Sequence, residues 1–288
     1  MVIISTPYQE HKEMNTLSKS LVGLPETNLR VCGLQVGLFS SSVNENLKKL
    51  VSAFESIKVN SVDLVIAPEV SSTYYNYNTI KNLKEGEEVL FLETLQALCC
   101  SKKCALVVGL AVRHGELLKN RAYFINENGE IKAYYDKMHL ISLMGETDYF
   151  HPGNTITVVN VRDWRVGIAI CFDLRFAELF LNYALDGCHL IVLPACWPSE
   201  RRNHWRNLHL ARAQECQCFF AGVNMGGVSP DGKIYGGSIV SSPDSVPVAE
   251  LGWGEEGTIF ANLDPEEIAR QKELFDLMKN RPRPPLLP

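Results

Sequence analysis

Three residues whose side chains suit covalent or acid–base chemistry each follow an apolar run of the sequence. Cys171 ends the apolar run in VGIAICFDLRFAEL (166–179), Glu69 follows one in VIAPEV, and Lys137 follows one in YYDKMHL. A cysteine nucleophile needs a base, and a carboxylate can serve as one. A lone acid or lysine after a strand is more often solvated than catalytic, but three such residues after three separate runs indicate a site.

The position of Cys171 has a physical meaning of its own. It lies between a predicted strand, 165–170, and a predicted helix, 174–186. Free amides and the helix dipole at a helix N-terminus favour a thiolate, and the active sites of α/β sheets lie at the carboxyl ends of strands. A buried cysteine is otherwise a small hydrophobic residue. Position alone therefore leaves a nucleophile and a structural cysteine equally open.

Strand-like and helix-like patterns alternate along most of the chain. They predict helices at 44–57, 87–100, 174–186, 203–217 and 264–278, and strands at 29–39, 62–67, 105–112, 121–125, 131–135, 156–161, 165–170, 189–193, 218–223, 235–241, 246–250 and 257–262. One α/β domain with helices over its sheets accounts for this order. The long irregular stretch 137–154 is of a length that is usually functional.

The two ends of the chain differ from the middle. Polar, aperiodic residues predict an N-terminal extension at 1–27, followed by a single domain at 28–278 and a Pro-rich tail at 279–288. The tail ends in RPRPPLLP, which cannot form a regular element because proline lacks a backbone donor.

Composition limits the partners of the protein. The chain has 288 residues and a formal net charge of -5, which argues against nucleic acid or an anionic membrane as its main partner. No apolar stretch approaches the length of roughly 18 residues that spans a membrane, and the start of the chain lacks a secretory pattern. The nine cysteines do not form the framework of a short secreted chain. Together these features predict a cytoplasmic protein.

Two other kinds of site are disfavoured. GVSPDGK (227–233) has the glycine and lysine spacing of a phosphate-binding loop, but Ile234 stands where that loop needs Ser or Thr. The stretch SPDGK is instead a turn pattern. His204 and His209 lack the spacing of a zinc-binding helix, so we expect no metal.

The ordered set APE, YDKMHL…GE…Y…PG and GIAICFDLRFAEL resembles the nitrilase, or carbon–nitrogen hydrolase, superfamily. The resemblance covers roughly residues 29–275, and the continuation PACWP…HW…L…ARAQE is similar to the ω-amidase and Nit-type amidase branch. It implies a four-layer αββα sandwich, in which two sheets pack face to face with helices outside. It also implies a homodimer or a larger homo-oligomer, and no cofactor.

The resemblance assigns roles to four residues. Glu69 is the expected base, Cys171 the nucleophile, and Lys137 the group that faces the oxyanion. Glu146, in GETDYFHPG, matches a second glutamate of the family and is expected to position Lys137 or the substrate nitrogen. The sequence departs from the branch at Phe172, often Tyr, at Ala177, often Pro, and in the lid segment SSTYYNYN (71–78), which leaves the choice of substrate open.

The implied reaction is hydrolysis of a small linear amide to a carboxylic acid and ammonia through a cysteine thioester, with a keto acid carrying a terminal amide as the favoured substrate. The alternatives are an N-carbamoyl hydrolase or a nitrilase of the same superfamily, or a catalytically silent binding protein of this fold. The silent protein is disfavoured because Glu69, Lys137 and Cys171 are all present.

Further residues are expected near the substrate. The amide of Phe172 would face the oxyanion, and Tyr75 in the lid is expected to contact the substrate. Trp197 and His204 would line the pocket, with core packing as an equal alternative. Arg175, one helical turn after Cys171, could hold a substrate carboxylate, although an ion pair with Glu178 or Glu215 is slightly favoured. Asp173 is expected to cap the helix.

Overall fold

The computed structural model describes residues 23–280. The predicted N-terminal extension, 1–27, lies outside the described residues up to residue 22, and the predicted tail lies outside them from residue 281.

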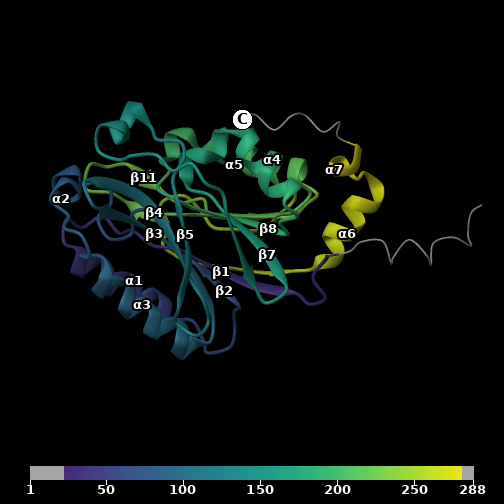
Figure 1. Cartoon of the computed structure of the whole chain (residues 1–288), viewed down its shortest axis with the longest axis horizontal. Helices are drawn as coiled ribbons and strands as arrows, with labels where there is room; N and C mark the ends of the chain where they lie inside the picture. The colour runs from purple at the N-terminus through teal and green to yellow at the C-terminus, as the bar shows by residue number, and fades with distance from the viewer. Residues whose placement is uncertain (1–22, 281–288) are drawn as a thin grey trace, which may run out of the picture.

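Two six-stranded sheets make up the middle of the molecule (Figure 1). The first has the order β14-β1-β2-β3-β4-β5, with bounds β14 (Gly257–Leu263), β1 (Leu29–Gln35), β2 (Leu64–Ile66), β3 (Ala105–His114), β4 (Leu117–Ile125) and β5 (Ile131–Asp136). The second has the order β13-β12-β9-β8-β7-β6, with bounds β13 (Pro247–Glu250), β12 (Ile239–Ser241), β9 (Phe219–Asn224), β8 (Leu190–Ala195), β7 (Trp164–Ile168) and β6 (Thr157–Val161). In each sheet three central strands are parallel, namely β1-β2-β3 and β7-β8-β9, and the outer pairs are antiparallel.

Side-chain alternation explains why the sheets form two inner layers. On β1, Leu29 and Val31 join the core shared with the second sheet, whereas Cys32 and Leu34 pack under helices α1 (Val43–Glu55) and α3 (Val89–Lys102). A strand buried on both faces in this way needs a continuous apolar sequence. Helices α4 (Ala177–Leu185) and α5 (Arg202–Cys216) cover the other sheet on the opposite side (Figure 1). The predicted αββα sandwich is confirmed.

The remaining elements are short or peripheral. They are α2 (Tyr77–Lys81), α6 (Pro265–Leu274), α7 (Leu277–Asn280), the hairpin β10 (Gly227–Val228) and β11 (Ile234–Tyr235), and the 3-10 turns η2 (Ser142–Met144), η3 (Glu146–Asp148), η4 (Cys171–Arg175) and η5 (Ser199–Arg201). The hairpin confirms that GVSPDGK is a turn. The sequence patterns did not predict α2.

Some predicted boundaries are wrong. The helix expected at 174–186 begins later, as α4 at Ala177, because its first residues belong to the 3-10 turn η4, which ends before an extended Phe176. The Phe176 ring stacks on His139 at 3.7 Å between ring centroids, and this contact holds the break. The helix expected at 264–278 is interrupted at Phe275, where the side chain of Gln217 accepts from the N–H of Leu277 at 2.8 Å and donates to the Phe275 carbonyl. The strand expected at 235–241 is divided by Gly236 and Gly237, both with positive φ.

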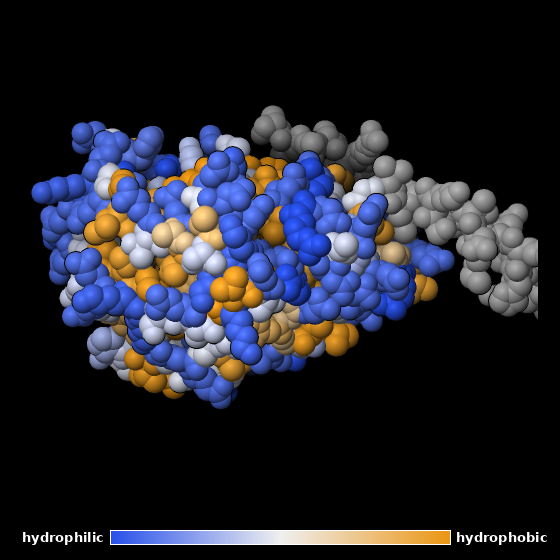
Figure 2. Space-filling model, turned by 90° about the horizontal axis from the view of Figure 1, so that it is seen from below, coloured by the Kyte–Doolittle hydropathy of each residue, from blue (hydrophilic) through white to orange (hydrophobic). Residues whose placement is uncertain are grey.

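The surface over α1 and α3 is mostly hydrophilic, with hydrophobic side chains gathered in smaller patches (Figure 2). On α3, Val89 and Leu90 are 48% and 63% exposed, which is normal for a soluble surface because polar atoms cannot cover a whole protein. Within residues 23–280, no helix is both long and apolar enough to span a bilayer.

The carboxyl ends of the parallel strands lie at one edge of each sheet, and the segments after β2, β5, β7 and β8 therefore meet. At this edge β3 has a glycine, Gly109, and the backbone of residues 68–70 passes directly over it. A Cβ added to Gly109 would lie 2.6 Å from the Cα of Glu69. The N–H of Gly109 donates to the carbonyl of Pro68, and its carbonyl accepts from Ser71. The strand thus fixes the backbone on both sides of Glu69.

Gly109→Ala should lower the free energy of unfolding by about 1–3 kcal/mol, because the added methyl group meets backbone rather than a flexible side chain. Urea unfolding measures the change. Gly257→Ala is the matched control, since its Cβ would meet only Leu251 Cδ2 at 3.4 Å. Equal stability of the two variants would contradict the close approach of the Glu69 segment to β3.

Candidate active site

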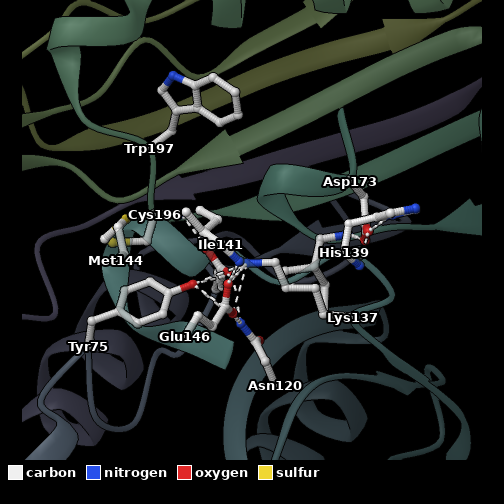
Figure 3. A network of polar contacts seen from close by, with 12 residues as sticks. Tyr75, Asn120, Lys137, His139, Ile141, Met144, Glu146, Asp173, Cys196 and Trp197 are labelled. Atoms are coloured by element: carbon white, nitrogen blue, oxygen red, sulfur yellow. Dashed lines mark hydrogen bonds and ion pairs between the residues drawn. The ribbon is translucent and has the colours of Figure 1, made fainter. Parts of the chain in front are cut away.

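Lys137 is the centre of a buried polar cluster at one end of the first sheet (Figure 3). It follows β5 directly, and its Nζ lies 2.8 Å from Glu69 Oε1 and 2.9 Å from both carboxylate oxygens of Glu146. All three side chains are 0% exposed. Burial opposes the charge on Lys137, but the carboxylates of Glu146 and Glu69 outweigh it and raise its pKa well above the usual value. Lys137 is therefore an ammonium ion and not a base.

Tyr75 and Asn120 complete the cluster. The Tyr75 hydroxyl donates to Glu69 Oε1 at 2.7 Å and accepts from Lys137 Nζ at 3.2 Å. Burial, with Glu146 and Glu69 nearby, raises the pKa of Tyr75 well above 10, so the phenol remains a neutral donor. Tyr75 was predicted as a substrate contact, and the structure places it against the base.

Asn120, on β4, was not predicted as a site residue. Its Nδ2 donates to Glu69 Oε1 at 2.7 Å and to Glu146 Oε1 at 2.9 Å, so one amide bridges two carboxylates. Its Oδ1 is buried without a hydrogen-bond partner. The reversed amide would turn that oxygen toward both carboxylates, so charge fixes the orientation. The signal in the sequence was a polar residue near the start of an apolar strand, which has no specific meaning by itself.

The distribution of donors separates the roles of the two glutamates. Glu146 Oε1 accepts hydrogen bonds from Asn120 and Lys137. Its Oε2 accepts hydrogen bonds from Lys137 and from the N–H of Ile141, the latter at 2.8 Å. Both of its oxygens are occupied. Glu69 Oε2 receives only the N–H of Cys196, at 2.9 Å. A carboxylate oxygen accepts about two hydrogen bonds, so Glu69 Oε2 retains capacity for a proton.

Cys171 lies at the end of β7 in a strained turn. Its φ is +45°, in the left-handed region, which costs a non-glycine residue about 1–3 kcal/mol and is found at functional sites. The thiol is 1% exposed. Burial and then Glu69 raise its pKa well above 9.0, while Lys137 and the N–H of Cys196 act in the opposite direction. A helix N-terminus would favour a thiolate, but η4 has only five residues and burial dominates, so the resting thiol keeps its proton.

Arg175, four residues after Cys171, does not form either of the ion pairs considered for it. Glu215 pairs with Arg212 at 2.7 Å, and no carboxylate of the described residues lies within ion-pair distance of Arg175. Burial accordingly lowers the pKa of Arg175. Arg30 is an arginine that does have a carboxylate partner, and its hydrogen bond to Asp63 raises its pKa. Within residues 23–280 the Arg175 guanidinium therefore has no carboxylate counterion.

Aromatic rings hold Arg175 instead. Its guanidinium lies 4.7 Å from the ring centroid of Trp197 and 5.5 Å from that of Phe172. Its Nη1 is 3.2 Å from Nδ1 of His204, an exposed residue of α5. Trp197 is buried and also packs on Trp205 at 5.5 Å between ring centroids, so it takes part in both the core and the Arg175 contact. The four predicted residues Phe172, Arg175, Trp197 and His204 are brought together.

The lid segment, 71–78, packs on the irregular stretch 137–154. The ring of Tyr77 stacks on Tyr149 at 4.4 Å between ring centroids, and its hydroxyl donates to the Met144 carbonyl at 2.8 Å. The Tyr74 hydroxyl meets that of Tyr235 at 2.8 Å. The segment that carries Tyr75 is therefore anchored on two sides, and it covers the cluster rather than extending into solvent.

The comparisons with known proteins agree with this geometry. The family model described as carbon-nitrogen hydrolase matches residues 28–273. The chain belongs to the carbon–nitrogen hydrolase family. It is similar to 2-oxoglutaramate amidase of Bacillus subtilis (strain 168), at 30% identity over 241 residues, which are 83% of this chain and 92% of that protein. It is also similar to omega-amidase YafV of Yersinia enterocolitica, at 29% identity over 252 residues, 86% of this chain and 95% of that protein.

Solved structures share the fold of this carbon–nitrogen hydrolase. XC1258 from Xanthomonas campestris superposes with a TM-score of 0.81 at 24% identity, covering 89% of this chain and 98% of that one. The resemblance to the nitrilase superfamily and its ω-amidase and Nit-type branch is thereby confirmed.

In this hydrolase, the opposing effects on Cys171 predict the response of its thiol to neutralising each neighbour. Glu69→Gln removes a negative charge that raises the thiol pKa, so the pH at which iodoacetamide labels Cys171 at half its maximal rate should fall. Lys137→Met removes a positive charge that lowers the pKa, so that pH should rise. Mass spectrometry of the labelled peptide measures both, with Cys100, the exposed cysteine, as internal control. Shifts in the same direction for both variants would contradict the arrangement.

Asn120→Asp should reduce turnover more than Asn120→Ala. The aspartate adds a third carboxylate beside Glu69 and Glu146 and provides no donor, whereas alanine only removes the bridging amide. Losing one buried hydrogen bond to a charged group costs about 1.5–3 kcal/mol, so we expect roughly a 10- to 100-fold loss of kcat for alanine. Ammonia release from a small amide measures it. An Asn120→Asp enzyme as active as the alanine variant would refute the bridging role.

Proposed function

We propose that this carbon–nitrogen hydrolase cleaves a small linear amide that also carries a carboxylate, releasing ammonia and leaving a dicarboxylic acid. The observation that carries the proposal is the guanidinium of Arg175, held on the rings of Trp197 and Phe172 without a carboxylate partner among the described residues. An arginine can bind a carboxylate through two parallel hydrogen bonds. The names of the two relatives, an oxoglutaramate amidase and an omega-amidase, support a 2-oxo acid with a terminal amide.

Acylation begins with the free lone pair of Glu69. Its Oε2 takes the proton of the Cys171 thiol, and the sulfur attacks the amide carbon. The oxyanion that forms faces Lys137 Nζ and the N–H of Phe172. The longest contact of the ammonium group, 3.2 Å to Tyr75, is the one that the oxyanion can replace. Removing one such donor typically costs about 3 kcal/mol of barrier.

The same glutamate acts next as an acid and then again as a base. Protonated Glu69 gives its proton to the departing nitrogen, and the tetrahedral intermediate releases ammonia to leave the thioester on Cys171, which completes acylation. In deacylation, a water molecule attacks the thioester while Glu69 takes one of its protons. The tetrahedral intermediate expels the sulfur, which recovers the proton, and the carboxylic acid is released. Glu146 keeps Lys137 in place throughout, because both of its oxygens are already bonded.

The charge state of the resting site fits a reaction that substrate binding starts. The raised pKa of Cys171 keeps the sulfur protonated, so Glu69 has a proton to accept. Lys137 carries a permanent positive charge, so an oxyanion is stabilised without a proton transfer from it. A permanently formed thiolate would leave Glu69 without its first function.

Two further properties belong to the proposal. We place the enzyme in a reducing, cytoplasmic compartment, supported by the nine cysteines, which are all free. We also propose a homodimer or larger assembly, supported by the family resemblance and by Leu274 and Phe275, which are 66% and 68% exposed and suited to cover by another subunit.

Arg175→Lys should lower kcat/KM for an ω-amide acid by about 30-fold, or ~2 kcal/mol, because a point charge cannot replace the two-pronged contact. For a neutral amide of equal length, kcat/KM should change by less than roughly threefold, because that substrate has no carboxylate for Arg175 to bind. The comparison uses ammonia release in steady-state assays, with Arg206→Lys, which alters an exposed pair with Glu250, as matched control.

Equal losses of kcat/KM on both substrates would contradict the carboxylate-binding role of Arg175.

The products distinguish the rival reactions of the family. An N-carbamoyl substrate would yield carbon dioxide with ammonia, and a nitrilase would consume a nitrile, whereas we expect ammonia alone from the ω-amide acid.

A further inference from the structure

Asp173 is a buried carboxylate that the proposed reaction does not use. It is 0% exposed and lies two residues after the nucleophile. Its Oδ1 accepts from the backbone N–H of His139 at 3.0 Å and from the His139 ring at Nδ1, 2.7 Å away. Its Oδ2 accepts from the Tyr135 hydroxyl at 2.8 Å and from the N–H of Ile170 at 2.9 Å. Each oxygen therefore accepts two hydrogen bonds, and Figure 3 shows Asp173 beside His139.

The partners of Asp173 flank two catalytic residues in the sequence. Tyr135 and His139 lie two residues on either side of Lys137, while Ile170 immediately precedes Cys171. Lys137 leaves the first sheet and Cys171 leaves the second. One carboxylate thus joins the two chain segments that must bring the ammonium group and the thiol together.

We propose that Asp173 is a positioning residue that fixes the Lys137 ammonium group relative to the Cys171 thiol across the interface between the two sheets. This inference rests on the proposed amidase reaction. The first sheet holds this segment on one side only, because β5 is an edge strand that pairs with β4 among the described residues, and the N–H of Lys137 donates to Asn120 on β4 at 2.9 Å. On the other side the Lys137 carbonyl accepts from Gly153 at 2.9 Å, and Asp173 adds the contact with the segment that carries Cys171.

The chemistry of the four donors explains why an aspartate occupies this position. Two of them are backbone N–H groups, from Ile170 and His139, which can donate but cannot accept. An asparagine would turn its NH₂ toward one of these donors and leave it unpaired in a buried place, which is costly. The carboxylate alone satisfies all four at once.

The aromatic contact at His139 strengthens the same junction. Its ring stacks on Phe176 at 3.7 Å with an interplanar angle of 9°, and Phe176 follows Arg175 directly. Because His139 is held both by Asp173 in the middle of η4 and by Phe176 just after it, the segment after Lys137 has two contacts with the turn that carries Cys171.

The first test compares Asp173→Asn with Asp63→Asn. Asp63 is the matched control because it is a largely buried aspartate that binds the Arg30 side chain at 2.9 Å and the Arg30 backbone N–H at 2.8 Å, and it lies outside the catalytic cluster. At a temperature where both variants are folded, Asp173→Asn should lower kcat for an ω-amide acid about 100-fold with KM changed less than threefold, roughly. Asp63→Asn should keep kcat within roughly twofold of wild type.

A kcat loss no larger than that of Asp63→Asn at equal loss of melting temperature would overturn the positioning role. So would a change confined to KM. If Asp173→Asn does not fold, the double variant Tyr135→Phe/His139→Leu replaces it, because this variant keeps the carboxylate and removes two of its four donors. Its kcat should fall about tenfold, and an unchanged kcat would overturn the role.

The labelling profile of Cys171 supplies a readout that does not depend on the amide reaction. Lys137 lowers the thiol pKa and burial raises it. If the double variant displaces Lys137, half-maximal labelling by iodoacetamide should move to higher pH. If it merely loosens the structure, the thiol becomes exposed and labelling should move to lower pH, which would count against positioning. Wild-type protein that releases no ammonia from any amide would refute the proposed function, while this profile would still decide the role of Asp173.

Discussion

Lys137 carries a positive charge at a point that water does not reach, and the rest of the site is arranged around that charge. An isolated ammonium ion in the interior would lose its proton. Here two carboxylates approach it within 2.9 Å, and they exceed its charge by one. Hydrogen bonds from Asn120, Tyr75 and two backbone amides offset the excess. Each partner is needed because removal of any one would leave a buried charge incompletely paired.

This electrostatic requirement explains why the site takes residues from both sheets. No single strand can supply two acids, a lysine and several neutral donors around one point. In the first sheet β2 and β5 run in the same direction and bring Glu69 close to Lys137, and the second sheet contributes Cys171 and the N–H of Cys196. The αββα sandwich thus serves the chemistry by aligning the carboxyl ends of strands from two layers. The close packing at Gly109 is one consequence of that alignment.

The elements and the charged residues of the buried cluster around Lys137 could be predicted because their signals are local. Apolar periodicity located the helices and strands, and the order of Glu69, Lys137 and Cys171 after apolar runs indicated the site. Asn120 could not be predicted, because its importance depends on which carboxylates lie opposite its amide. The pairing of Arg175 could not be predicted either, since Glu215 is available in the sequence but is taken by Arg212. The charge state of the resting Cys171 could not be predicted, because burial, a property of the whole fold, outweighs the local turn.

The raised pKa of the buried Cys171 thiol also bears on the chemical durability of the protein. Peroxides oxidise thiolates much faster than thiols, and exposed cysteines faster than buried ones. A nucleophile that stays protonated and covered between turnovers offers oxidants little to attack. Among the nine cysteines, eight are buried and Cys100, on α3, is exposed. Oxidative damage therefore falls first on a helix that covers the first sheet, at a side chain that takes no part in the catalytic cluster.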